Sequence, residues 1–181
     1  FSPREIWTGA NPVSETWTNV ANAAQRASAP IRSWRAGHRF PYGGATIEVL
    51  SPPQDYEPAR APKNNDSLVL LIEHGQTPFL LSGDMEREME WRIIESGRLP
   101  KIDVLKVAHH GSKTSTTAEF LEAAQPRFAL ISAGEGNLFK HPHPSVVERL
   151  EAAGTHILRT DRNGLIRVVS DGRRTEIYTP G

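Results

Sequence analysis

The 181-residue sequence contains no cysteine, and this absence removes several classes of site at once. Without thiols the chain has no disulfide framework, no thiolate zinc site and no cysteine nucleophile. It also has no excess charge, since 21 basic and 21 acidic side chains cancel. A chain of zero net charge lacks the overall basic footprint of a non-specific nucleic-acid-binding domain.

Long apolar runs are missing as well. The longest covers residues 68–72, which is far too short to span a bilayer, and no signal peptide is recognisable. With 38% apolar and 23% charged residues, the chain has the composition of a globular protein, and its length fits one domain over residues 1–181. Because the first residue is Phe1 rather than Met, we expect the chain to be part of a longer product.

The spacing of apolar residues predicts an α/β protein. Strands are expected at residues 5–8, within 31–50, and at 68–73, 79–82, 102–107, 127–132, 156–159, 165–169 and 175–178; helices are expected at 13–27, 85–95, 116–124 and 145–153. The first half is mainly antiparallel in pattern, whereas the second half alternates strand and helix. A mixed sheet with helices on its outer face is therefore the expected architecture.

Three candidate metal ligands each follow a predicted strand. Asp84 ends the segment Leu-Ser-Gly-Asp, His110 lies in Lys-Val-Ala-His-His-Gly-Ser, and His141 lies in Lys-His-Pro-His-Pro. Carboxylate and imidazole groups bind divalent ions. We expect the three side chains to converge at one edge of the sheet, with Asp84 and His110 also acting in catalysis. The chain contains no dense His-x-His-x-Asp-His block.

Each candidate also has a structural alternative. Asp84 suits the N-cap of a helix that begins at Met85. Adjacent residues of an extended chain point to opposite faces, so only one of His109 and His110 is expected to bind metal. We favour His110 as the ligand, with His109 either supporting a metal ligand or touching the substrate.

The second histidine motif leaves a similar choice. Pro144 suits the first turn of a helix whose cap is His143 or Ser145, which makes His141 the better ligand. His143 is then a candidate for a supporting or substrate-contacting role. Ser112 and Lys113, which follow the first motif, are candidates for the same role, although such residues also serve as caps.

Five blocks of the sequence, taken together, resemble one family. They are Asn-Asp-Ser-Leu-Val-Leu (65–70), Leu-Leu-Ser-Gly-Asp (80–84), Ile-Asp-Val-Leu-Lys-Val-Ala-His-His-Gly-Ser (102–112), His-Pro-His-Pro (141–144) and Arg-Thr-Asp-Arg-Asn-Gly (159–164). In this order and spacing they are similar to the metallo-β-lactamase-like domain of ComEC-type competence proteins, which are membrane channels for DNA uptake. The likeness covers nearly the whole chain and is strongest over residues 64–169.

The resemblance implies a metallo-β-lactamase αββα sandwich with a centre of two divalent ions, zinc or manganese. Asp84 would match the family's bridging aspartate, His110 the histidine of its His-His-Gly motif, and His141 the histidine of its His-Pro motif. The implied activity is metal-dependent hydrolysis of phosphodiesters, with single-stranded DNA as the substrate. The implied parent is a polytopic bacterial inner-membrane protein that carries this soluble domain outside the cytoplasm.

The chain departs from the family pattern in one respect. Family members carry an early Asp-x-Gly strand and a His-x-His-x-Asp-His block, and residues 1–181 contain neither block in the expected place. We therefore expect the chain to match the C-terminal two-thirds of the domain, to need the missing N-terminal part as its partner, and to bind metal weakly or not at all by itself. The alternatives are another phosphoesterase of the superfamily, or a catalytically silent module that binds nucleic acid or a partner.

Overall fold

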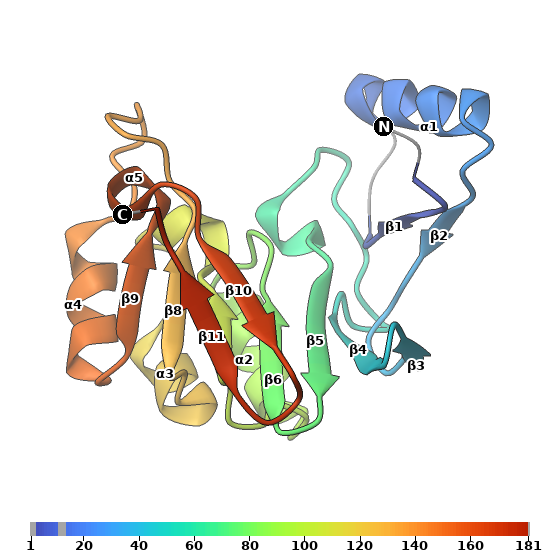
Figure 1. The fold of residues 1–181 in the computed structure, drawn as a ribbon. Helices are drawn as coiled ribbons and strands as arrows, with labels where there is room; N and C mark the ends of the chain where they lie inside the picture. The colour runs from blue at the N-terminus through green and yellow to red at the C-terminus, as the bar shows by residue number, and fades with distance from the viewer. Residues whose placement is uncertain (1–2, 11–13, 181) are drawn as a thin grey trace.

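The computed structural model describes residues 3–10 and 14–180, and its largest element is a seven-stranded sheet of order β3-β4-β5-β6-β7-β8-β9 (Figure 1). The strands are β3 (Arg39–Tyr42), β4 (Ala45–Ser51), β5 (Val69–His74), β6 (Thr77–Leu81), β7 (Val104–Lys106), β8 (Phe128–Ile131) and β9 (His156–Arg159). Pairing is antiparallel from β3 to β6 and parallel from β6 to β9. This confirms the mixed sheet predicted from the sequence.

Three helices connect the parallel strands. They are α2 (Arg87–Glu95), α3 (Ala118–Ala124) and α4 (Pro144–Ala152), and they lie on one face of the sheet (Figure 1). Each one follows a strand and leads into the next parallel strand, as a crossover connection requires. The order of the strands therefore places the loops after β6, β7 and β8 at the same edge.

The core lies between these helices and the sheet. On β5, Val69 and Leu71 are buried and alternate with the partly exposed Leu70 and Ile72. The buried side chains pack with others from α2, α3 and α4, namely Met89, Ile93, Phe120, Leu121, Ala124, Val146 and Leu150. These apolar residues thus lie on the one face of each helix that packs against the core.

A hairpin of β10 (Arg167–Ser170) and β11 (Thr175–Tyr178) lies over the other face of the sheet (Figure 1). It is joined to the β5–β6 turn by a hydrogen bond of 2.6 Å from Gln76 N–H to the carbonyl of Gly172. A Cβ on Gly75 would lie 2.2 Å from that same carbonyl oxygen, so the contact requires glycine. Before the hairpin, the short helix α5 (Thr160–Asn163) replaces the simple turn predicted there.

The first part of the chain forms a smaller unit with α1 (Glu15–Arg26) and a parallel pair of β1 (Ile6–Thr8) and β2 (Ile31–Ser33). Ser14 caps α1 by accepting a hydrogen bond of 3.1 Å from Trp17 N–H. The predicted helix start at residue 13 lies outside the described residues. No helix in the described ranges is long and apolar enough to cross a membrane.

Candidate metal centre

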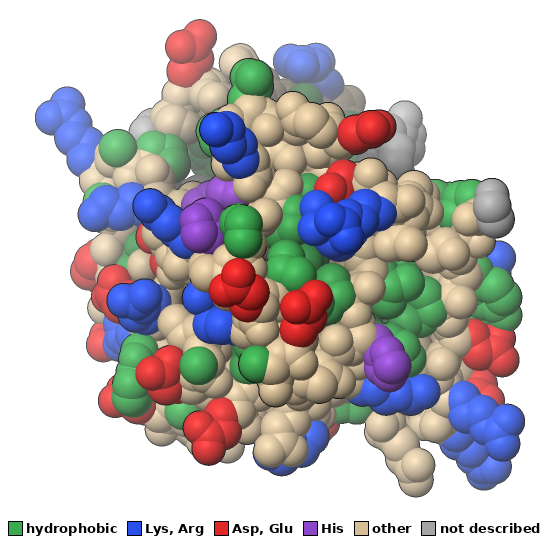
Figure 2. Space-filling model, turned by 90° about the vertical axis from the view of Figure 1, so that its left-hand side faces the viewer, with side chains coloured by type: hydrophobic (Ala, Val, Ile, Leu, Met, Phe, Trp, Pro, Cys, Tyr) green, Lys and Arg blue, Asp and Glu red, His purple; other side chains and the backbone are tan. Residues whose placement is uncertain are grey.

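Three loops meet at the edge of the sheet where β6, β7 and β8 end. Asp84 follows β6, His109 and His110 follow β7, and His141 lies in the loop after β8. The carboxyl ends of parallel strands share one edge, so this placement brings the candidate residues to one side of the molecule. Figure 2 shows histidine side chains close together on one face, with Lys and Arg side chains beside them.

Asp84 is held by the tight turn that ends β6. Gly83 has a φ of 54°, and a Cβ there would lie 2.7 Å from the Cβ of Ser67, so the approach requires glycine. Ser67 Oγ accepts a hydrogen bond of 3.0 Å from Asp84 N–H. The Asp84 side chain is 40% exposed, and one of its carboxylate oxygens lies 3.8 Å from Nε2 of His110.

The structural alternative for Asp84 is wrong, because this residue does not cap a helix. Helix α2 begins at Arg87 rather than at Met85, and its N-cap residue is Glu86. Met85 is instead fully buried in the core. The Asp84 carboxylate is therefore free of a capping role.

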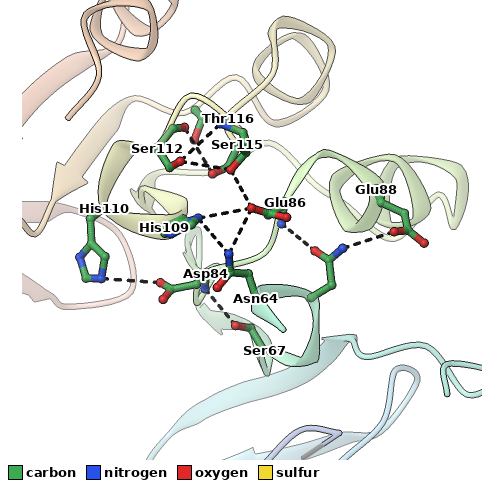
Figure 3. A network of polar contacts seen from close by, with 12 residues as sticks. Asn64, Ser67, Asp84, Glu86, Glu88, His109, His110, Ser112, Ser115 and Thr116 are labelled. Atoms are coloured by element: carbon green, nitrogen blue, oxygen red, sulfur yellow. Dashed lines mark hydrogen bonds and ion pairs between the residues drawn. The ribbon is translucent and has the colours of Figure 1, made fainter. Parts of the chain in front are cut away.

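His109 and His110 form a tight turn rather than an extended segment. Their φ angles are 46° and 55°, in the left-handed region that residues other than glycine seldom adopt. The premise that they alternate across an extended chain was therefore wrong. The two rings nevertheless point apart, His110 toward Asp84 and His109 toward Glu86 (Figure 3).

The hydrogen bonding of His110 fixes which of its ring nitrogens faces Asp84. Nδ1 lies 2.7 Å from the carbonyl oxygen of Ser132, which can only accept, so Nδ1 carries a proton. In the neutral ring Nε2 is then a bare lone pair, and it lies 3.8 Å from Oδ1 of Asp84. Histidine ligands of metals characteristically donate their other N–H to a carbonyl in this way.

The spacing of these two atoms fits a shared cation. Zinc–nitrogen and zinc–oxygen bonds of about 2.0–2.2 Å allow two ligand atoms on one ion to lie up to about 4 Å apart. When the ring is neutral, two acceptors face each other at 3.8 Å, and a cation between them would relieve their repulsion. The pair therefore has the donor chemistry and the separation that a divalent ion needs.

His109 belongs to a polar network on the side of α2 (Figure 3). Its Nδ1 lies 3.7 Å from Oε1 of Glu86 and 3.4 Å from Nδ2 of Asn64. The same carboxylate accepts hydrogen bonds of 3.1 Å from Asn64 and 2.8 Å from Thr114 Oγ1. His109 thus lies beside Glu86, and the supporting role expected for it stays a prediction.

His141 lies beside the first histidine motif, with its ring 5.8 Å from that of His109. Burial lowers its pKa, and repulsion from His109, His110 and His143 lowers it further. A lowered pKa favours the neutral imidazole, which is the form that binds metal. Its Nδ1 is buried without a hydrogen-bond partner among the described residues, and such atoms are rare in folded proteins.

The two histidine motifs are in direct backbone contact. His143 N–H donates a hydrogen bond of 2.9 Å to the carbonyl of Gly111. Gly111 has a φ of 83°, and a Cβ on it would lie 2.6 Å from the Cβ of Pro142. Asn137 holds the second motif from the other side, because its side chain bonds to both N–H and carbonyl of His141 at 2.9 and 2.7 Å.

The remaining candidates have distinct positions. His143 is the N-cap of α4, and its Nδ1 accepts a hydrogen bond of 3.3 Å from Ser145 N–H, so its capping role is confirmed. Ser112 is buried and its hydroxyl lies 3.1 Å from that of Thr114. Lys113 is exposed and lines a hollow on the α2 side of the centre.

Sequence reasoning missed the residues that support the ligands. Neither Glu86 nor Asn64 was among the candidate residues. Lys106 was also missed; its Nζ lies 3.4 Å from the carbonyl of Gly83, and burial lowers its pKa, while Asp84 opposes that shift. Such contacts join residues far apart in the sequence, which leaves no local pattern to detect.

The described residues do not form a complete metal site by themselves. Within residues 3–10 and 14–180, no group of three or more His, Asp or Glu side chains is arranged to hold an ion. The structure pairs Asp84 with His110 and places His141 next to His109. The convergence of Asp84, His110 and His141 on one point remains a prediction.

Comparisons with known proteins agree with the blocks found in the sequence. The chain is 41% identical over 148 residues to ComE operon protein 3 of Bacillus subtilis, 39% over 142 residues to recombination protein 2 of Haemophilus influenzae, and 34% over 133 residues to competence protein ComA of Neisseria gonorrhoeae. These matches cover 82%, 78% and 73% of the chain but only 19%, 17% and 19% of the relatives. The chain thus spans less than a fifth of their length. No family model matches it.

Among solved structures, CmlA, a diiron β-hydroxylase from Streptomyces venezuelae, aligns with a TM-score of 0.51 at 10% identity, covering 86% of this chain and 38% of that one. A point mutant of the CmlA β-hydroxylase gives a TM-score of 0.54 at 12% identity, with the same coverage. At this identity the likeness concerns the fold, which is that of the metallo-β-lactamases. Together with the competence relatives, it shows that the chain belongs to the metallo-β-lactamase-like domain family of the ComEC-type competence proteins.

Proposed function

We propose that this chain supplies ligands to a divalent-metal hydrolase site that cleaves phosphodiesters, with DNA as the substrate during competence uptake. The observation that carries the proposal is the pairing of His110 with Asp84, in which Nε2 lies 3.8 Å from a carboxylate oxygen. The names of the relatives, which refer to competence and recombination, support DNA as the substrate.

Asp84, His110 and His141 are the proposed ligands. A divalent ion bound there would lower the pKa of a coordinated water and withdraw charge from a phosphoryl oxygen. The chain's own residues hold the arrangement: Ser132 fixes the tautomer of His110, and Asn137 fixes the backbone of His141. Glu86 orients His109 behind them.

Further ligands are needed for the two ions that we propose for this centre. Two ions require more donors than the three proposed here, and the printed sequence has no His-x-His-x-Asp-His block to supply them. We therefore propose that residues outside 1–181 complete the centre. The full-length protein would be a membrane protein that holds this domain outside the cytoplasm, next to incoming DNA.

Calorimetric titration of the chain with Zn²⁺ and Mn²⁺, together with single-strand cleavage by the full-length protein, tests the proposal. We expect weak, substoichiometric or single-ion binding by residues 1–181, and chelator-sensitive cleavage by the full-length protein. Tight binding of two ions by residues 1–181 would contradict the proposal that outside ligands are needed. Cleavage that survives chelation would contradict the metal-dependent mechanism.

A further inference from the structure

Two exposed aromatic side chains lie at opposite ends of a series of residue contacts that includes the histidines of the candidate metal centre. Phe139 is 80% exposed and its ring is stacked on that of His141, with centroids 6.0 Å apart. Trp91 is 47% exposed on α2. Large aromatic residues are more often buried, so two exposed rings near one centre call for an explanation.

Phe139 is presented by an ordered turn. Asn137 donates a hydrogen bond of 2.9 Å to the carbonyl of Gly134 and also holds both backbone groups of His141. The turn keeps Phe139 and its neighbour Leu138, which is 95% exposed, out of the core. Phe139 and His141 line a hollow of about 390 Å³ together with His110.

Trp91 lines a second and larger hollow of about 980 Å³. Glu86 forms part of its wall, and the same carboxylate lies 3.7 Å from Nδ1 of His109. The hollow therefore adjoins the polar network of His109 and Glu86 that Figure 3 shows. Contacts link Phe139 to His141, His141 to His109 and His109 to Glu86, and Glu86 lines the same hollow as Trp91.

The larger hollow is lined by charges of both signs, and its two carboxylates, Glu86 and Glu88, accept hydrogen bonds from Asn64, Thr114 and Asn65. Its cations are Arg87, Arg92 and Lys113. Arg92 is neutralised by an ion pair of 2.6 Å with Asp55, whereas Arg87 and Lys113 are exposed and form no ion pair with any described residue. Arg87 is tied to the loop that carries Lys113, since its N–H donates a hydrogen bond of 3.1 Å to the carbonyl of Thr114.

Aromatic faces beside unpaired cations, arranged along one path, are the features that bind single-stranded nucleic acid. Unpaired bases can stack on side chains, whereas the bases of a duplex are already stacked on each other. Building on the proposed function, we propose that one DNA strand crosses the metal centre between Phe139 and Trp91. Its bases stack on these two rings, and its phosphates contact Arg87 and Lys113.

The test measures binding by residues 1–181 in the presence of EDTA, so that cleavage plays no part. Fluorescence anisotropy compares a labelled oligothymidylate with a strand of the same length made of abasic sites. Trp91→Leu and Phe139→Leu keep apolar side chains but remove the aromatic face. We expect each to weaken binding of the oligothymidylate about fivefold or more and to leave binding of the abasic strand unchanged.

The charge variants have a different expected signature. Arg87→Ala and Lys113→Ala should weaken binding of both strands, and each should reduce the slope of log K against log salt by about 0.7. Lys101→Ala, at an exposed position before β7 and so at the opposite end of that strand from His109 and His110, is the matched control and should change neither affinity nor slope. Trp91→Phe, which keeps a ring, should retain most of the affinity for oligothymidylate.

Several outcomes would overturn the proposed path. The first is that the Leu variants bind oligothymidylate with wild-type affinity. The second is that these variants lose affinity equally for oligothymidylate and for the abasic strand. The third is that the wild-type chain binds neither strand. Asp84→Ala separates this inference from the proposed function, because it should abolish cleavage by the full-length protein while leaving strand binding intact. Retained cleavage by Asp84→Ala would refute the proposed function. Unaltered binding of oligothymidylate by the Leu variants would refute the proposed path of the strand alone.

Discussion

Gly111 and Pro142 are packed so closely that a single added carbon on the glycine would lie 2.6 Å from the Cβ of the proline. This contact joins the loop after β7 to the loop after β8, and with them His110 and His141. Neither loop is fixed by regular secondary structure. The separation of the two proposed ligands is therefore set by the closest backbone approach between their loops.

Gly111→Ala is expected to push the two loops apart. The alanine suffers both from a φ of 83° and from the contact with Pro142. Gly97→Ala is the matched control, because Gly97 has a φ of 66° but nothing within 4 Å of its added Cβ. Left-handed backbone alone costs about 1–2 kcal/mol, so Gly97→Ala should lose that much in urea denaturation, and Gly111→Ala about 1–3 kcal/mol more. Equal losses would show that the contact with Pro142 does not matter.

His110→Ala should remove metal binding without loss of stability. Its side chain is 47% exposed, and surface substitutions usually change the free energy of unfolding by less than about 0.5 kcal/mol. Metal affinity is measured in the full-length protein by calorimetry, and stability by thermal unfolding of both chains. His38→Ala, at an exposed site on another part of the molecule, should leave affinity unchanged. A drop in stability without a drop in affinity would assign His110 a structural role.

His109→Ala should reduce metal affinity or activity by about 10–100-fold rather than abolish it. Substitution of a residue that supports the metal ligands typically causes a loss of this size. Glu86→Gln should produce a smaller loss in the same direction, because it weakens the group that orients His109 at 3.7 Å. Metal titration of both variants in the full-length protein provides the comparison. A complete loss in His109→Ala would make His109 a direct ligand.

Buried Glu90 gives the fold a predictable pH dependence. It accepts hydrogen bonds from the N–H groups of Thr116 and Thr117 and from the Thr117 hydroxyl, yet burial outweighs them and raises its pKa above the ordinary value of 4.5. Folding thus favours the protonated form of Glu90. The contribution of this group to the stability of the fold is present in full below pH 4.5 and is lost as pH rises through the raised pKa.

Glu90→Gln cannot titrate, so the stability of the wild type relative to this variant should fall as pH rises from 4.5 through that window. Urea denaturation at a series of pH values measures the difference. At low pH the variant should be less stable than the wild type, because the substitution disturbs the hydrogen bonds cited above. This difference in the free energy of unfolding should become smaller as the pH rises. A gap that is constant across the series would mean that the pKa of Glu90 is not raised.

Much of the fold was predictable because apolar periodicity sets it directly. The strands predicted at 68–73 and 79–82 and the helices predicted at 85–95 and 145–153 gave local signals, and the structure confirms these elements as β5, β6, α2 and α4. Helix starts were less predictable: α3 begins at Ala118 rather than at Thr116, because Thr116 adopts a φ of 58° and Thr117 is the N-cap.

The site was predictable only in part, for a physical reason. Strand ends could be located, and so the residues that follow them, Asp84 and His110, were correctly placed at one edge of the sheet. The left-handed turn at His109 and His110 could not be foreseen, because it depends on the hydrogen bond from His109 N–H to the carbonyl of Gly83, 3.1 Å away across two strands. The contacts of Glu86 are of the same long-range kind.

The measurement that tests the central claim most directly is single-stranded DNA cleavage by the full-length protein, in wild-type form and as Asp84→Ala and His110→Ala, with and without a chelator. We predict cleavage by the wild type that a chelator stops and that added Mn²⁺ or Zn²⁺ restores, with no cleavage by either variant. Chelator-resistant cleavage, or full cleavage by Asp84→Ala, would contradict the proposal that Asp84 and His110 hold a catalytic divalent ion.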